Sequence, residues 1–222
     1  MAADGKLEDS LVSDEGKYGG VRNDQRTSKG MLLGIGQDET VARIEDRIAT
    51  WSLIPKDNGE AMQILRYEHG QKYLPHHDFF GNGGQDFLNG ERVATVLMYL
   101  SDVEKGGETV FPLSEAMYVQ PKDDGSWSDC AKRGYAVKPK KGDAILFFSL
   151  QPDASLDTSS LHGSCPVISG VKWSATKWIH EEDDLQAICA TGVAVQLFGE
   201  FHHSKLWFLY KHPKESNLAR FC

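Results

Sequence analysis

The chain has little that would place it in a membrane or on nucleic acid. Within its 222 residues no apolar run reaches the roughly 18 residues that a membrane-spanning helix requires. The opening residues, 1–6, lack the apolar segment of a secretory signal, and taken alone they predict a cytosolic chain. The formal net charge of −8 argues against a partner with a phosphate backbone, because such partners select basic surfaces.

Cysteine is scarce and has no zinc-site spacing. None of the four cysteines belongs to a CxxC pair; they are Cys130, Cys165, Cys189 and Cys222. Cys130 and Cys165 could pair across a loop, and four free thiols are an equally open alternative. With 40% hydrophobic and 25% charged residues, the composition predicts one soluble globular domain with a modest extension.

One amphipathic helix precedes a series of short strands. Asp38 as N-cap and Pro55 beyond the end delimit a packing helix, whose apolar residues at helical spacing are Val41, Ile44, Ile48 and Trp51. Period-two patterns predict strands at 61–68, 92–101, 134–138, 143–150 and 171–180. This order predicts an α+β chain whose body is a sandwich or jelly roll.

Three regions differ in character along the chain. Residues 1–30 predict an extended, loop-rich segment, 31–180 the main domain, and 181–222 a divergent tail that is either a helical appendage or poorly ordered. Two long loops inside the domain, 79–91 and 112–133, are candidate lids over an active site.

Three residues far apart in the chain form a candidate metal triad. His76 and Asp78 are two positions apart, which on a strand places both side chains on one face. His162 is the candidate for the third ligand. Two imidazoles and a carboxylate are the ligands of non-haem Fe(II) sites with open positions, whereas closed zinc sites usually have four protein ligands.

The last predicted strand carries a polar face. Its members alternate with apolar residues and are Lys172, Ser174, Thr176, Trp178 and His180. They form either the solvent face of an edge strand or, as we expect, the lining of a cavity. There Lys172 would hold the far carboxylate of 2-oxoglutarate, with hydroxyl hydrogen bonds from Tyr67 and Thr109.

These residues together resemble the prolyl 4-hydroxylases of plant and green-algal type. The resemblance covers about residues 5–180 and includes the segments 70–78, 107–109, 140–144, 160–166 and 172–180. It implies a double-stranded β-helix (jelly-roll) core with a supporting N-terminal helix. It also implies 4-hydroxylation of peptidyl proline in proline-rich, cell-wall-type proteins, with Fe(II), O2 and 2-oxoglutarate as reactants and ascorbate as reductant.

The resemblance also implies a role for individual residues. His76, Asp78 and His162 would bind iron, and the residues around 2-oxoglutarate would be Lys172, Tyr67, Thr109 and Trp178. The implied peptide-contacting residues are Arg26, Ser28, Glu60, Arg92 and His180. Cys130 and Cys165 match a cysteine pair that could be bridged in the lumen of the endoplasmic reticulum or Golgi, where such enzymes reside.

The chain departs from the family pattern at both ends. Members usually carry an N-terminal membrane anchor and then an opening strand and helix, which we expect to be absent here, and the acidic run 181–184 differs from their continuation. Two alternatives therefore remain beside the leading hypothesis. One is the same chemistry on another substrate; the other is a truncated, non-catalytic isoform that binds proline-rich peptides, self-associates or pairs with a full-length family member.

Overall fold

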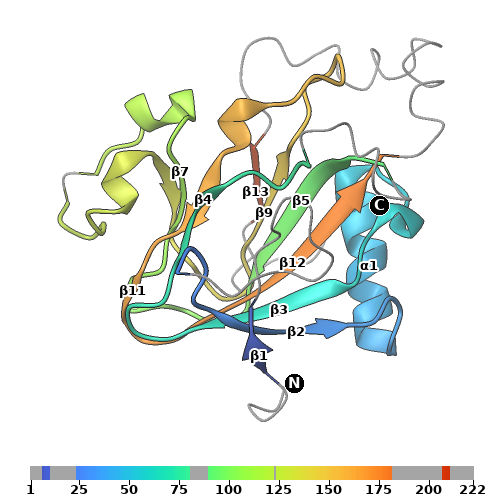
Figure 1. Ribbon diagram of the computed structural model, residues 1–222, viewed down its shortest axis with the longest axis horizontal. Helices are drawn as coiled ribbons and strands as arrows, with labels where there is room; N and C mark the ends of the chain where they lie inside the picture. Colours follow the sequence, from blue (N-terminus) through green and yellow to red (C-terminus); the bar gives the residue numbers. More distant parts are fainter. Residues whose placement is uncertain (1–6, 11–23, 81–89, 123, 182–206, 211–222) are drawn as a thin grey trace, which may run out of the picture.

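A computed structural model describes residues 7–10, 24–80, 90–122, 124–181 and, for the backbone alone, 207–210. Its strands form two main antiparallel sheets that face each other, and one long helix lies against the larger sheet (Figure 1). The larger sheet has seven strands in the order β1-β2-β3-β12-β5-β9-β13, and the smaller has four in the order β4-β10-β7-β8. A two-stranded ladder, β11-β6, completes the body.

The elements have the following bounds. The larger sheet contains β1 (Glu8–Asp9), β2 (Lys29–Leu33), β3 (Met62–Tyr67), β12 (Lys172–His180), β5 (Arg92–Tyr99), β9 (Ala144–Phe148) and β13 (Trp207–Tyr210). The smaller sheet and the ladder contain β4 (Tyr73–His76), β10 (His162–Ser164), β7 (Thr109–Phe111), β8 (Tyr135–Val137), β11 (Val167–Ser169) and β6 (Lys105–Gly106). The helices are α1 (Glu39–Ser52) and the short 3-10 helices η2 (Lys56–Asn58), η3 (Glu115–Tyr118), η4 (Ala131–Arg133) and η5 (Thr158–Ser160).

The expected packing helix is confirmed as α1. The Asp38 side chain accepts a hydrogen bond from the backbone N–H of Val41 at 2.9 Å, and the helix ends at Leu53, whose φ of 60° is left-handed. Ile48 of α1 packs with Ile179 of β12 and with buried residues of β5 and β9. The helix therefore covers the outer face of the larger sheet and leaves the inner face for the smaller sheet.

A buried ion pair joins α1 to β12. Lys177 Nζ lies 2.6 Å from Glu45 Oε1, and the two side chains are 2% and 4% exposed. Gly59 leaves room for this lysine, because a Cβ built on Gly59 would lie 2.4 Å from Lys177 Cε. Lys177 is on the outer face of β12, so the pair fixes the strand from the side opposite its other polar residues.

The five predicted strands are present and are one or two residues shorter at their ends. The sheet also crosses the expected boundary at residue 30, because β2 begins at Lys29 and pairs with β3 from Lys29↔Arg66 to Leu33↔Met62. The loop 79–91 and the tail 181–222 lie outside the described residues, except for 79–80, 90–91, 181 and the backbone of 207–210. No helix in the part of the chain that is described is long and apolar enough to cross a bilayer.

Cys130 and Cys165 form a disulfide, so the alternative that both are free thiols is wrong. Cys130 belongs to the loop 112–133, and Cys165 directly follows β10 and is fully buried. The same loop is held by Glu108, whose carboxylate accepts hydrogen bonds from the backbone N–H and the hydroxyl of Ser128. These contacts fasten one of the two candidate lids to the smaller sheet.

Candidate active site

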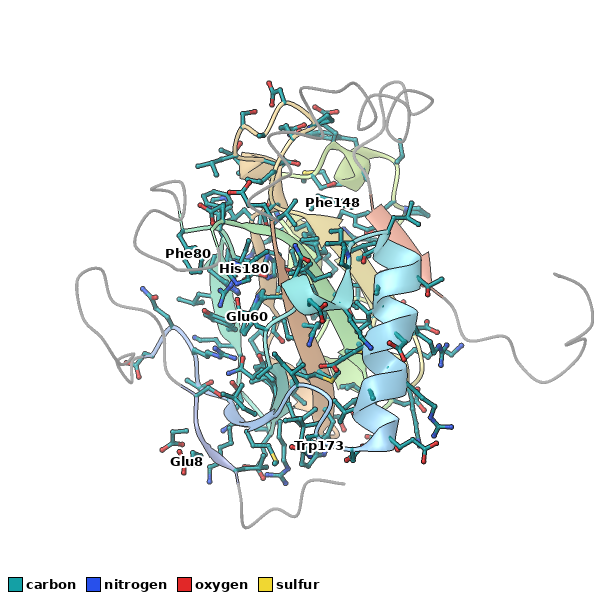
Figure 2. All side chains as sticks on the ribbon, turned by 90° about the vertical axis from the view of Figure 1, so that its right-hand side faces the viewer. Glu8, Glu60, Phe80, Phe148, Trp173 and His180 are labelled. Atoms are coloured by element: carbon teal, nitrogen blue, oxygen red, sulfur yellow. A yellow bond between two sulfur atoms is a disulfide. The ribbon has the colours of Figure 1, made fainter. Side chains whose placement is uncertain are left out.

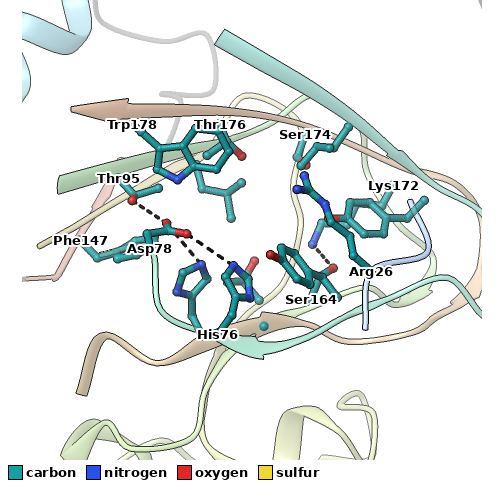
Figure 3. Close-up of a pocket in the computed structure, with 17 residues that line it drawn as sticks. Arg26, His76, Asp78, Thr95, Phe147, Ser164, Lys172, Ser174, Thr176 and Trp178 are labelled. Atoms are coloured by element: carbon teal, nitrogen blue, oxygen red, sulfur yellow. Dashed lines mark hydrogen bonds and ion pairs between the residues drawn. The ribbon is translucent and has the colours of Figure 1, made fainter. Parts of the chain in front are cut away.

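The polar face of β12 lines a pocket between the two sheets, which confirms the cavity interpretation over a solvent-facing edge (Figure 3). The β12 side chains in the lining are Lys172, Ser174, Thr176 and Trp178. β12 lies between β3 and β5 in the larger sheet, so it is not an edge strand, and one face of this sheet is turned toward the smaller sheet (Figure 1). The polar residues are buried there because the sandwich closes over them.

The three expected metal ligands meet at one end of this pocket. His76 ends β4, and His162 begins β10 directly opposite it in the antiparallel register. Asp78 Oδ1 lies 3.5 Å from His76 Nε2, and Oδ2 lies 3.6 Å from His162 Nε2. One ligand atom from each residue lies within 4.8 Å of the others. Asp78 follows the end of β4, so the expectation that it shares a strand with His76 is corrected: a bend turns it toward the histidines.

Neighbouring groups orient all three side chains. The Nδ1 atoms of His76 and His162 lie 2.9 Å from the carbonyl oxygens of Leu74 and Ser160, respectively. Because a carbonyl oxygen only accepts, each Nδ1 carries its hydrogen and each Nε2 presents a lone pair toward Asp78. The hydroxyl of Thr95 donates a 2.7 Å hydrogen bond to Asp78 Oδ2.

Burial and charge favour the ligating forms of Asp78 and His162. Burial alone would raise the pKa of Asp78, but the adjacent His162, His76 and Arg92 outweigh it and hold that pKa well below its usual range. Burial lowers the pKa of His162 to about 4, against the opposing effect of Asp78. Two imidazole nitrogens and one carboxylate fit Fe(II), and three protein ligands leave positions open for reactants.

Lys172 lies at the other end of the pocket with 1% of its surface exposed. Its Nζ donates to Ser164 Oγ at 2.8 Å and lies over the rings of Tyr67 and Tyr99, 5.3 and 5.7 Å from their centroids. Burial lowers its pKa to about 7, although Glu108 favours the charged form. No ion pair joins Lys172 to a carboxylate among the described residues, so a bound anion would meet a buried cation.

The other residues expected around 2-oxoglutarate also line the pocket. Tyr67 is buried, and burial raises the pKa of its phenol. Thr109 Oγ1 accepts a hydrogen bond from Tyr99 at 2.8 Å. The indole N–H of Trp178 is buried and has no hydrogen-bond partner among the described residues, which is costly unless a ligand accepts it.

Three of the expected peptide-contacting residues form one charged cluster beside the pocket. Glu60 Oε1 lies 2.5 Å from Arg92 Nε and 2.8 Å from His180 Nε2 (Figure 2 shows Glu60 and His180 together). Arg92 lies over the Trp178 ring at 4.1 Å, which joins the cluster to the pocket lining. Burial lowers the pKa of His180, but the hydrogen bonds to Glu60 and to the carbonyl of Gly90 raise it overall.

Of the remaining two residues expected to contact the peptide, one lines the pocket and the other does not. Arg26 lines the pocket, donates to Gln63 Oε1 at 2.7 Å and lies 4.7 Å from the centroid of the Tyr73 ring. Ser28 is not among the residues that line the pocket, and its buried hydroxyl donates to Ser10 Oγ at 2.9 Å.

Four pocket residues with a polar or aromatic side chain had not been singled out from the sequence. Tyr73 stacks on the His76 ring with centroids 3.6 Å apart, and Phe147 meets the His162 ring edge-on at 4.6 Å. Thr95 binds Asp78, and Ser164 binds Lys172. Tyr73 and Ser164 could have been found from their places three residues before His76 and two after His162. Thr95 and Phe147 lie in apolar strands, with no distinguishing spacing.

Comparison with known proteins identifies the family. A model described as the 2OG-Fe(II) oxygenase superfamily matches residues 62–180. Probable prolyl 4-hydroxylase 7 of Arabidopsis thaliana is 58% identical over 178 residues, which are 80% of this chain and 56% of that protein. Prolyl 4-hydroxylase 2 of Arabidopsis thaliana is 54% identical over 178 residues, covering 78% and 59%. The chain thus spans somewhat over half the length of these curated relatives.

Two solved structures share the fold. A viral collagen prolyl hydroxylase from Paramecium bursaria Chlorella virus-1, in complex with 2OG, is 29% identical with a TM-score of 0.54 over 70% of this chain and 79% of that one. A Pseudomonas putida prolyl-4-hydroxylase is 17% identical with a TM-score of 0.50, covering 80% and 79%, and supports the fold alone. The jelly-roll core is confirmed, and the chain belongs to the 2OG-Fe(II) oxygenase superfamily.

Proposed function

We propose that this chain is a prolyl 4-hydroxylase, which converts peptidyl proline, O2 and 2-oxoglutarate into peptidyl 4-hydroxyproline, succinate and CO2. The observation that carries the proposal is the pocket itself. A triad of two histidines and an aspartate lies at one end, and the buried Lys172 lies at the other. The names of the relatives, which are prolyl 4-hydroxylases, support proline as the substrate.

In this proposal His76, Asp78 and His162 hold the iron. Their donor atoms already converge, and carbonyl groups fix both imidazole rings with Nε2 toward Asp78. Bound Fe(II) supplies the redox chemistry that couples decarboxylation of 2-oxoglutarate to hydroxylation of a C–H bond. Phe147 packs edge-on against the His162 ring and gives this end of the pocket an apolar wall.

Lys172 holds the C5 carboxylate of 2-oxoglutarate. Its ammonium group is directed by Ser164, and the hydroxyls of Tyr67 and Thr109 lie in the same lining. A buried lysine without a carboxylate partner gains more from an anion than an exposed one, because water does not screen the pair. Trp178 supplies a further donor through its buried indole N–H, for which the described part of the chain holds no acceptor.

The peptide lies along the cluster of Glu60, Arg92 and His180. His180 is placed to be a cation, because both of its ring nitrogens face acceptors, Glu60 and the carbonyl of Gly90. Arg26, at the other side of the lining, supplies a second cationic contact. In this proposal residues 1–30 take part in substrate binding beside a catalytic domain of 31–180, and the buried hydrogen bond of Ser28 to Ser10 supports the segment that carries Arg26.

Substrate class, reductant and compartment complete the proposal. Proline-rich cell-wall-type proteins are the substrates, and ascorbate is the reductant. The reaction takes place in the lumen of the secretory pathway, as in the endoplasmic reticulum or Golgi. The Cys130–Cys165 disulfide supports this compartment, since such bonds persist in oxidising environments and are rare in the cytosol.

The test is a turnover assay on the purified chain. It is incubated with Fe(II), 2-oxoglutarate, ascorbate and a proline-rich peptide, and succinate and hydroxyproline are measured. We expect both products to depend on peptide and to disappear in His162→Ala. His69→Ala is the matched control, because His69 is exposed and outside the pocket, and it should retain full turnover. A folded wild-type chain that binds the peptide without releasing succinate would establish the non-catalytic alternative.

A further inference from the structure

Thr95 reaches the carboxylate of Asp78 from the opposite sheet. Its hydroxyl donates to Asp78 Oδ2 at 2.7 Å, and the two residues are 1% and 5% exposed (Figure 3). Thr95 lies within β5, where it pairs with Trp178 on β12 and with Phe147 on β9. The position of the hydroxyl is therefore set by three adjacent strands of the larger sheet.

The two oxygens of Asp78 have different surroundings as a result. Oδ1 faces His76 Nε2 at 3.5 Å, whereas Oδ2 lies 3.6 Å from His162 Nε2 and also accepts the hydrogen of Thr95. A carboxylate oxygen that accepts a hydrogen bond has one lone pair occupied and part of its charge neutralised. Oδ1 is therefore the better donor that Asp78 offers to a metal.

The number of oxygens that Asp78 contributes affects what else can bind. A carboxylate binds a metal through one oxygen or through both. Two histidines and one aspartate oxygen leave three of six octahedral positions open. A chelating 2-oxo acid together with O2 needs all three, so a second oxygen from Asp78 would compete with a reactant.

We propose that Thr95 is a positioning residue that withholds Asp78 Oδ2 from the metal and so keeps open a position that 2-oxoglutarate needs. This inference rests on the proposed function, because it concerns the same metal and co-substrate. Thr95 acts through Asp78 and does not itself bind the metal. A threonine needed only for packing would be replaceable by valine, which has nearly the same shape, whereas the proposed role requires the hydroxyl.

The test compares Thr95→Val, which removes the hydroxyl, with Thr95→Ser, which keeps it. Under anaerobic conditions Fe(II) binding is measured by competition with a chelator. 2-Oxoglutarate is then titrated into the loaded protein and followed by its visible charge-transfer band with Fe(II). We expect Thr95→Val to raise the Kd for 2-oxoglutarate by about tenfold. The Kd for Fe(II) should change less, and Thr95→Ser should match the wild type.

Ser149→Ala is the control, because it removes a fully buried hydroxyl that does not belong to the pocket lining, and it should change neither Kd. Thr95→Ala gives the same comparison if the valine variant does not fold. The proposal is overturned if variants without the hydroxyl bind 2-oxoglutarate as the wild type does, or if they weaken Fe(II) binding alone. A wild-type chain that binds neither Fe(II) nor 2-oxoglutarate would instead overturn the proposed function, and this inference with it.

Discussion

His162 lies directly opposite His76 in the antiparallel pairing of β10 with β4, and the two rings are 4.4 Å apart between centroids. Both imidazoles therefore come from the smaller sheet, while Lys172 comes from β12 of the larger sheet. The distance between the metal end and the cationic end of the pocket is set by how the two sheets pack. A chelating 2-oxo acid with a distal carboxylate must span these two ends.

The first prediction concerns the protonation of Lys172. Burial holds its pKa near 7, so at pH 8 most of the ligand-free protein carries a neutral amine. The dianion of 2-oxoglutarate pairs with the ammonium form, and binding at pH 8 should take up close to one proton. Calorimetry of the Fe(II)-loaded protein in buffers with different ionisation heats measures this uptake. The KM for 2-oxoglutarate should also rise as pH increases above about 7.

Lys172→Arg provides the matched variant, because a guanidinium stays charged at pH 8 and would bind the carboxylate without taking up a proton. Lys172→Met should lower kcat/KM for 2-oxoglutarate by about 10- to 100-fold, the value of a charged hydrogen bond. Equal proton uptake in the wild type and Lys172→Arg would show that another group titrates.

The second prediction separates peptide binding from co-substrate binding. Arg92→Lys keeps the charge but loses the two-pronged contact with Glu60 and the planar stacking on Trp178. We expect the KM for a proline-rich peptide to rise by about tenfold, with a smaller change in the KM for 2-oxoglutarate. Steady-state kinetics with each substrate varied in turn measures both constants.

Arg66→Lys is the control for this substitution. Arg66 also lies near an aromatic ring, that of Trp173, and pairs with Glu68, but it does not line the pocket. Both KM values should stay at their wild-type levels in this variant. If Arg92→Lys raised the KM for 2-oxoglutarate more than the KM for the peptide, Arg92 would not belong to the proposed peptide site.

Sequence patterns predicted the elements whose periodicity is long enough to read. The helix was found from its N-cap Asp38 and four apolar positions, and β12 from nine alternating residues. β4, β7 and β10 have three or four residues, too few to show a period, and the equally short β8 was predicted because strand-forming residues lie between Gly134 and Pro139. For this reason Asp78 was expected on a strand with His76, whereas it lies in a bend after the end of β4.

Some residues of the candidate site could likewise be predicted from the sequence, and others could not. His76, Asp78, His162 and Lys172 stand out because charged or metal-binding side chains interrupt strand-like sequence. Thr95 does not stand out, since threonine is common in strands and its partner is 17 residues away. Ser28 was assigned to the peptide contacts with Arg26 because the family resemblance implied it, yet a resemblance does not show which side chain of a segment faces a pocket. Only the pairing of the sheets supplies that information.

The third prediction concerns the disulfide. Replacing both Cys130 and Cys165 by serine releases a loop closed over 35 residues and should lower the free energy of unfolding by about 3–4 kcal/mol. Urea unfolding with and without a reducing agent measures the change. The reducing agent should destabilise the wild type and leave the double variant unaffected. A wild type equally stable in both conditions would show that the bond contributes little.

The last prediction concerns the buried pair of Lys177 and Glu45. Lys177→Met leaves Glu45 as a buried carboxylate without its cation, and we expect a loss of about 3–5 kcal/mol in the free energy of unfolding. Glu45 also accepts a hydrogen bond from the backbone N–H of Gly36, which is exposed and can turn to water instead. The double variant Lys177→Met/Glu45→Leu should therefore recover most of the loss.

The pair of Lys56 and Asp46 is the matched control, because its side chains are 55% and 57% exposed. Lys56→Met should cost at most about 1 kcal/mol, since an exposed pair is screened by water. Urea unfolding of the single and double variants gives the coupling between Lys177 and Glu45. Since Lys177 lies on the face of β12 opposite the pocket, folded variants should keep the wild-type KM for 2-oxoglutarate. If Lys177→Met lowered the free energy of unfolding no more than Lys56→Met does, this would show that water reaches Glu45 despite its burial.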